Sequence, residues 1–148
     1  MLNILVAVDG SEGSQRALDA AAKLANASKA AAVTVLFSKE LRFPLVALTG
    51  LPGVQVEADL PAMQAEMEQV AKRALDKAKD ALAKQGVKPA LRSAWGPPAD
   101  IICKTAQDER FDLVVIGHRG LGQMAGALLG SVSDRVVHHS KVPVLVVP

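Results

Sequence analysis

The sequence contains few of the residue types that mark secreted, membrane and nucleic-acid-binding proteins. One cysteine in 148 residues, Cys103, rules out an internal disulfide and favours a reducing cytoplasm. Tyrosine is absent, and one tryptophan and three phenylalanines offer no platform on which single-stranded nucleic acid could stack. A net charge of +2 with no dense basic block also argues against a nucleic-acid partner.

Long hydrophobic runs are missing as well. No stretch of about eighteen apolar residues is present, so no membrane span is expected. The apolar residues 1–6 lack a basic region and a cleavage site, and Asp9 soon interrupts them, so a buried strand explains them better than a signal peptide. Half of the residues are hydrophobic, which is enough for a core, and we expect one domain over residues 1–148.

Strand-like and helix-like segments alternate along the chain. The patterns predict strands at 3–8, 33–38, 88–94, 112–116 and 142–147, and helices at 10–27, 60–85, 99–108 and 132–139. The uniformly apolar runs 113–116 and 144–147 are typical of strands buried on both faces. Strands separated by helices pair in parallel through right-handed crossovers. The sequence therefore predicts a doubly wound, Rossmann-like α/β domain with a five-stranded parallel sheet.

One irregular segment, 39–59, interrupts the alternation. It carries prolines and glycines, including Pro44 and Gly50, together with apolar residues such as Leu45 and Leu48. A connection of this length is either functional or a surface excursion held by a few side chains, and the sequence does not decide between the two.

A glycine-rich segment follows the fourth predicted strand. Gly117-His118-Arg119-Gly120 is separated by nine residues from Gly130-Ser131, where a helix is predicted to begin. A strand, a glycine loop and a helix start are the usual arrangement for holding a phosphate on backbone N–H groups. The segment is neither a Walker A loop nor a dinucleotide-binding fingerprint. Each glycine alone is weak evidence, and Gly130-Ser131 alone could simply begin a helix.

A second polar turn, Asp9-Gly10-Ser11, follows the first predicted strand. If the first and fourth strands are neighbours, both turns face one crevice at the carboxyl ends of the strands. The Asp9 carboxylate could accept hydrogen bonds from ribose hydroxyls or contact a phosphate-bound Mg²⁺ indirectly. Alternatively, Asp9 or Ser11 merely caps the first helix.

The spacing Gly117-x2-Gly120-x9-Gly130-Ser131, followed by Val132 and Ser133, resembles the ATP-binding signature of the universal stress protein A family. Residues 4–11 (ILVAVDGS) resemble that family's first strand and turn, and residues 140–147 (SKVPVLVV) resemble its last strand. The resemblance covers essentially the whole chain, and the spacer length matches. It implies an adenine nucleotide α-hydrolase-like sheet with strand order 3-2-1-4-5.

The resemblance also implies a role for each site residue. The adenine would lie near backbone atoms of Ala7 and Ser38, and Asp9 would meet the ribose. Gly117 would lie near the ribose and phosphates. The phosphates would be held by N–H and hydroxyl groups in the set Gly120, Gly130, Ser131, Val132 and Ser133. Arg119 either adds a guanidinium contact to the phosphates or points to solvent. The expected cofactor is ATP with Mg²⁺ or Mn²⁺ bridging its phosphates, with no metal site built by the protein itself.

In function, the resemblance implies a cytoplasmic ATP-binding stress-response protein that acts as a nucleotide-dependent regulatory homodimer, paired through residues 142–147. An alternative is a slow ATP hydrolase or autophosphorylating enzyme of the same fold. The sequence shows no base, arginine finger or P-loop lysine for the γ-phosphate, which argues against efficient catalysis. A third hypothesis is an interaction protein that keeps its glycines for packing alone.

Three other residues invite a chemical role but have simpler explanations. His138 and His139 lie near the end of a predicted helix, where a histidine suits the helix dipole, and adjacent helical residues point in different directions. Cys103 falls on an apolar helix face, so we expect a buried, unreactive thiol.

Overall fold

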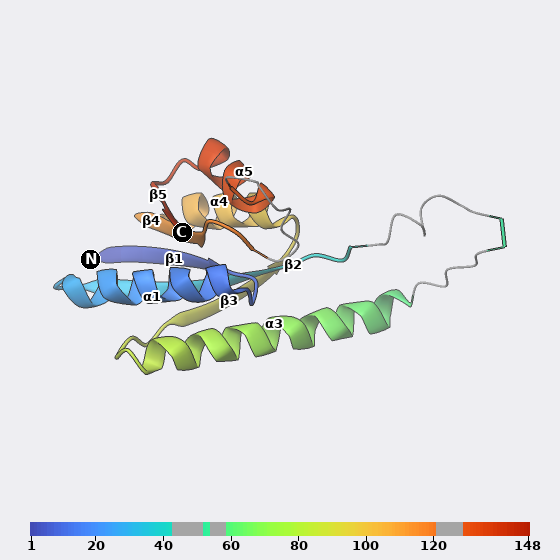
Figure 1. Cartoon of the computed structure of the whole chain (residues 1–148), viewed down its shortest axis with the longest axis horizontal. Coiled ribbons are helices and arrows are strands. Elements are labelled where there is room, and N and C mark those ends of the chain that lie inside the picture. The colour runs from blue at the N-terminus through green and yellow to red at the C-terminus, as the bar shows by residue number, and fades with distance from the viewer. Residues whose placement is uncertain (43–51, 54–58, 121–128) are drawn as a thin grey trace.

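Five parallel strands form a single sheet, flanked by helices, in the computed structural model, which describes residues 1–42, 52–53, 59–120 and 129–148 (Figure 1). The strands are β1 (Leu2–Val8), β2 (Ala31–Lys39), β3 (Ala90–Trp95), β4 (Leu113–Gly117) and β5 (Val144–Val147). The helices are α1 (Glu12–Ala27), α3 (Leu60–Ala83), α4 (Pro98–Asp108) and α5 (Ser131–His139). The sheet order is β3-β2-β1-β4-β5, which confirms the predicted fold class and strand order.

Helices cover both faces of the sheet. Figure 1 shows α1 and α3 on one face and α4 and α5 on the other. Because successive side chains of a strand point to opposite faces, Ile4 and Val6 of β1 pack on the α1 side while Leu5 packs on the α4 side. All three side chains are fully buried. β1 is therefore the centre of two hydrophobic layers.

The structure corrects the expectation that both apolar runs are buried on both faces. Residues 113–116 fit it closely, with Val114 and Val115 fully buried. In β5 no residue is buried, and Leu145 is 37% exposed. The reason is its place in the sheet: β5 is an edge strand with one neighbour.

The element ends follow local chemistry. β3 and β5 begin two residues later than predicted, just beyond Pro89 and Pro143, which have no N–H to donate to a ladder. α1 is capped by Ser11, whose side chain accepts from the Ser14 N–H. After α3, Gly86 adopts a left-handed φ of +77°, which agrees with the predicted stop.

Most of the irregular segment 39–59 falls in ranges 43–51 and 54–58, which lie outside the described residues, so its interpretation stays a prediction. Within the part of the chain that is described, no helix is long and apolar enough to cross a membrane.

A charged side chain is buried where β2 ends. Lys39 is 6% exposed, and its Nζ lies 2.8 Å from Oε1 of Glu68 on α3. The same ammonium lies 5.1 Å from the ring centroid of Trp95, at the end of β3. The hydrogen bond from Lys39 lowers the pKa of Glu68, although partial burial of the carboxylate opposes this. These contacts join α3 to the carboxyl edge of the sheet.

We predict that Glu68→Gln lowers the melting temperature at neutral pH, because the buried Lys39 ammonium loses its counter-charge. A depressed folded-state pKa stabilises the fold above the unfolded pKa, and this contribution is lost as the pH falls through the folded value. The difference in melting temperature between the variant and wild type should therefore shrink below about pH 4. Thermal unfolding followed by circular dichroism across that range measures it.

The matched control is Asp76→Asn, which removes the exposed Lys72–Asp76 pair on the same helix. We expect little change in the melting temperature of this variant, because exposed ion pairs contribute little to stability. Equal melting temperatures for the Glu68→Gln variant and wild type at neutral pH would contradict the stabilising role of the buried pair.

Candidate functional site

The structure brings the two polar turns together at the carboxyl edge of the sheet. β1 pairs directly with β4, with Ala7 opposite Ile116, so the turns after these strands are neighbours. A Cβ atom added at Gly120 would lie 2.3 Å from Oδ2 of Asp9. The order β3-β2-β1-β4-β5 reverses direction between β1 and β4, which is where open α/β sheets bind ligands.

The Asp9 carboxylate is held by a small hydrogen-bond network. Its Oδ1 accepts from the Ser11 backbone N–H at 3.0 Å and from the Ser14 hydroxyl at 2.5 Å. The Asp9 N–H donates in turn to the Ser14 hydroxyl oxygen at 2.8 Å. Of the two residues suggested as helix caps, Ser11 is the cap. Asp9 is instead fixed beside the first turn of α1, half-buried.

The first turn of α1 touches the end of β4 backbone to backbone. A Cβ at Gly13 would lie 2.0 Å from the carbonyl oxygen of Arg119, and one at Gly117 would lie 2.6 Å from backbone atoms of Gly13. Glycine is required at both positions, because no side chain fits between the two segments. This contact sets the distance between the Asp9 turn and the 117–120 loop.

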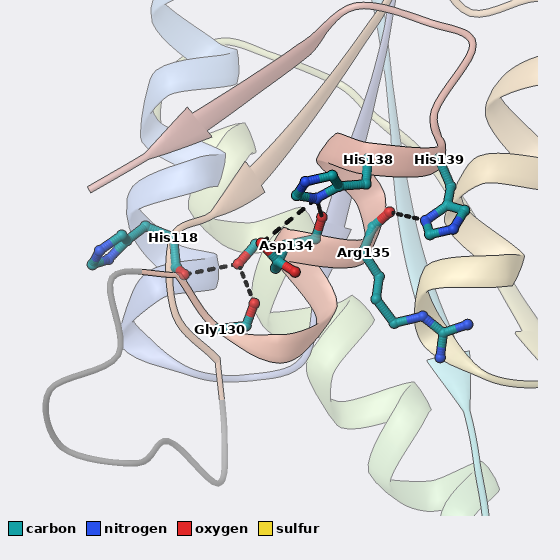
Figure 2. A network of polar contacts seen from close by, with 7 residues as sticks. His118, Gly130, Asp134, Arg135, His138 and His139 are labelled. Atoms are coloured by element: carbon teal, nitrogen blue, oxygen red, sulfur yellow. Dashed lines mark hydrogen bonds and ion pairs between the residues drawn. The ribbon is translucent and has the colours of Figure 1, made fainter.

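The start of α5 is tied to the same loop. The Gly130 N–H donates to the His118 carbonyl at 2.8 Å. The Ser133 hydroxyl lies 2.9 Å from that carbonyl oxygen and 3.0 Å from the carbonyl oxygen of Gly130 (Figure 2). Ser133 is only 2% exposed, and its hydroxyl proton is directed at these protein carbonyls. The phosphate contact expected of this hydroxyl stays a prediction.

Among the described residues, no side chain caps the first turn of α5, in contrast to α1 and α3. Gly130 occupies the cap position and has no side chain to offer. Backbone N–H groups at a helix start that lack such a partner favour an anion. Ser131 is exposed at the beginning of this turn, and Val132 is half-buried against the α4 side of the core.

The remaining predicted site residues lie at the same edge. Ala7 is buried near the end of β1, and β2 runs alongside it. The Ser38 hydroxyl donates to the Gly96 carbonyl at 2.8 Å, which ties the end of β2 to the turn after β3. The Arg119 backbone lies between Gly13 and Gly130. All ten predicted residues therefore lie on β1, β2, β4, α5 or the turns at their carboxyl edge.

Sequence reasoning missed Gly13 and Ser14. The signal for Gly13 was a glycine inside the first turn of a helix, a position that otherwise favours better helix formers. Ser14 carried no comparable signal, because a serine near a helix start reads as an ordinary capping residue.

The two C-terminal histidines have local partners. The Nδ1 atoms of His138 and His139 lie 2.8 Å and 2.9 Å from the carbonyl oxygens of Asp134 and Arg135, one turn earlier (Figure 2). Among the described residues, no group of three or more histidine, cysteine, aspartate or glutamate side chains could hold a metal ion.

Cys103 is half-buried rather than fully buried. Burial, reinforced by the nearby Asp100 carboxylate and opposed by Arg135, raises the pKa of its thiol. The thiol therefore stays protonated near neutral pH, in agreement with the expected lack of reactivity.

Fold and site define a class: doubly wound α/β proteins with glycine-rich turns at the carboxyl edge of the sheet, where the strand order reverses. The sequence profile of the universal stress protein family matches residues 1–148, and the chain belongs to this family. Universal stress protein YxiE of Bacillus subtilis is 35% identical over 97% of both chains. Universal stress protein Rv1636 of Mycobacterium tuberculosis is 31% identical over 97% of this chain and 94% of its own.

A solved structure gives the same fold. The crystal structure of a universal stress protein in complex with cAMP is 27% identical to this chain, covers 99% of it and 97% of its own length, and superposes with a TM-score of 0.73.

We predict that Gly117→Ala lowers the free energy of unfolding by about 1–3 kcal/mol, because the new methyl group overlaps backbone atoms of Gly13 that cannot move independently of α1. Urea unfolding at equilibrium measures the change.

Gly130→Ala is the matched control. Its Cβ would lie 3.4 Å from the nearest atoms, so we expect a loss below about 1 kcal/mol. Equal stability of the two variants would show that the contact between α1 and β4 is not tight in solution.

Proposed function

We propose that ATP binds at the carboxyl edge of the sheet, in a crevice between the Asp9 turn and the start of α5. The proposal rests on one observation. The start of α5, which no described side chain caps, and the fixed Asp9 carboxylate both contact the segment 118–120. Gly130 contacts His118 and Arg119, and Gly120 contacts Asp9. A phosphate group suits the first site and a ribose hydroxyl suits the second.

Each residue then has a defined part. The backbone around Ala7 and Ser38 contacts the adenine, and Asp9 accepts hydrogen bonds from the ribose. Gly117 lies near the ribose and phosphates, the Gly120 N–H binds a phosphate, and Arg119 adds positive charge. The N–H groups of Ser131, Val132 and Ser133 bind the phosphates, and Gly130 places no side chain beside them. The similar universal stress protein solved with cAMP supports an adenine nucleotide as the ligand class.

Mg²⁺ or Mn²⁺ would be carried in by the nucleotide. The described residues offer no cluster of three ligating side chains, and Mg²⁺ commonly takes phosphate oxygens and water with only one or two carboxylates. Asp9 is the carboxylate nearest to the loop and would act through water. The ion would neutralise charge between the phosphates.

The output we propose is regulatory: a cytoplasmic stress-response protein whose nucleotide-bound state is recognised by other molecules. Hydrolysis is at most slow, since the sequence supplies no P-loop lysine, and the acidic residue in the first turn of α5, Asp134, lies 3.6 Å from His138 Nδ1 on the same helix. A phosphate-release assay separates this function from a hydrolase. Turnover well above once per minute that disappears in Gly130→Val would establish the enzyme instead.

We predict that Gly130→Val weakens ATP binding by about tenfold or more, because its branched side chain would lie against the α5 turn where a phosphate must approach. Gly130→Ala should have a smaller effect, because it adds one methyl group at ordinary contact distance. Isothermal titration with ATP and Mg²⁺ measures both. Wild-type protein that gives no heat at millimolar ATP and purifies without nucleotide would overturn the proposal.

We also propose a homodimer formed through residues 142–147. β5 is an edge strand, and Leu145 and the nearby α5 residue Val137 are among the exposed large hydrophobic side chains. The carbonyls of Pro143 and Val147 accept from β4, so the backbone polar groups of the alternate residues Val144 and Val146 point away from the sheet. Those outward groups are available to pair with a second copy.

We predict that Val146→Pro gives a monomer, because proline removes an outward N–H while leaving the ladder to β4 intact. Val146→Ala loses similar side-chain volume but keeps the N–H, so it should remain dimeric. Light scattering at micromolar concentration should give twice the 15.5 kDa chain mass for wild type and one chain mass for the proline variant. A wild-type monomer, or a dimeric proline variant, would contradict this interface.

A further inference from the structure

Ser14 is one of three buried polar or charged side chains among the described residues, together with Lys39 and Ser133. It is 7% exposed and lies in the first turn of α1. Every buried side-chain nitrogen and oxygen described in the structure has a hydrogen-bond partner. The Ser14 hydroxyl lies 3.3 Å from the Ser11 hydroxyl, and its two shorter hydrogen bonds are both to Asp9, which indicates that it is placed to act on that residue.

The hydroxyl contacts Asp9 from two sides. It accepts from the Asp9 backbone N–H at 2.8 Å and donates to Oδ1 of the same residue at 2.5 Å. A hydroxyl can do both at once, since it carries one proton and two lone pairs. The two bonds together restrict rotation of the Asp9 side chain relative to its own backbone.

A third bond completes the restraint. The Ser11 N–H also donates to Oδ1, at 3.0 Å, so this oxygen is held by two donors on the α1 side. The other oxygen, Oδ2, is then directed at Gly120, where a Cβ would lie within 2.3 Å of it. The carboxylate thus presents one oxygen to the helix and the other to the loop.

We propose that Ser14 is the positioning residue for sugar recognition, and that it gives the crevice its preference for nucleotides with free ribose hydroxyls. This inference rests on the proposed nucleotide function. A carboxylate fixed before the ligand arrives loses little rotational freedom when it accepts hydrogen bonds from the 2′- and 3′-hydroxyls. Without the Ser14 hydroxyl, Asp9 keeps the bond from the Ser11 N–H but loses both bonds to Ser14, so the ligand must supply more of the ordering and the contribution of the sugar hydrogen bonds falls.

The test compares two probes, Mg²⁺–ATP and Mg²⁺–2′,3′-dideoxy-ATP, by isothermal titration. Wild type should prefer ATP by about tenfold or more, the amount expected for hydrogen bonds to a charged acceptor. In Ser14→Ala this preference should fall to about threefold or less. Affinity for the dideoxy nucleotide should stay unchanged, because that probe makes no sugar hydrogen bond. A purely structural role for Ser14 would weaken both probes alike.

Two further variants test whether the effect depends on the Ser14 hydroxyl. Ser28→Ala, at the other end of α1, removes a hydroxyl that donates to Ala30 and should keep the full ATP preference. Ser14→Cys replaces the hydroxyl by a weaker donor of similar size, so it should also lose preference, and it serves if the alanine variant does not fold.

The outcomes separate the two proposals. If wild type binds neither probe, the proposed function fails. If wild type binds both probes equally, or if folded Ser14→Ala or Ser14→Cys keeps the wild-type preference, nucleotide binding stands and the positioning role of Ser14 is overturned.

Discussion

The backbone contact between the first turn of α1 and the end of β4 controls the rest of the site. Gly13 and Gly117 leave no room for a side chain between these segments, so the helix start and the strand end act as one wall. Asp9 and Ser14 lie on one side of this contact, and the 118–120 loop lies on the other. The distance between the Asp9 turn and the 118–120 loop therefore depends on the absence of a side chain at both glycines. Gly130 and Ser133 then bring α5 against the same loop through the His118 carbonyl.

Much of this arrangement could be predicted, because the decisive patterns are local. Apolar runs give the strands, helical spacing gives the helices, and the resemblance of the glycine spacing to a known family gives the strand order and the site loop. The prediction that β5 is buried on both faces was wrong, because an apolar run does not reveal whether the strand has a second neighbouring strand in the sheet. Gly13 and Ser14 were missed for a related reason. Their role comes from contacts with Arg119 and Asp9, which only the folded topology brings into reach.

The buried polar side chains hold together the edge of the sheet where the candidate site lies. Ser14, Lys39 and Ser133 all lie near the carboxyl ends of the strands, and each has partners there. Lys39 joins α3 to the sheet, Ser14 fixes a carboxylate, and Ser133 joins α5 to the loop. Among the described residues, the buried polar side chains are thus concentrated at the carboxyl edge of the sheet.

The central position of β1 has a consequence for biosynthesis. β1 precedes the other four strands of the sheet along the chain, yet one of its two neighbours, β4, comes about a hundred residues later. While the chain grows from the ribosome, the apolar edge formed by Ile4 to Ala7 can pair with β2 but has no partner on its other side. An open apolar edge of this kind invites pairing with other chains. The second edge of β1 therefore stays open until residues 113–117 are made, and release of a shorter product would leave this buried strand unprotected.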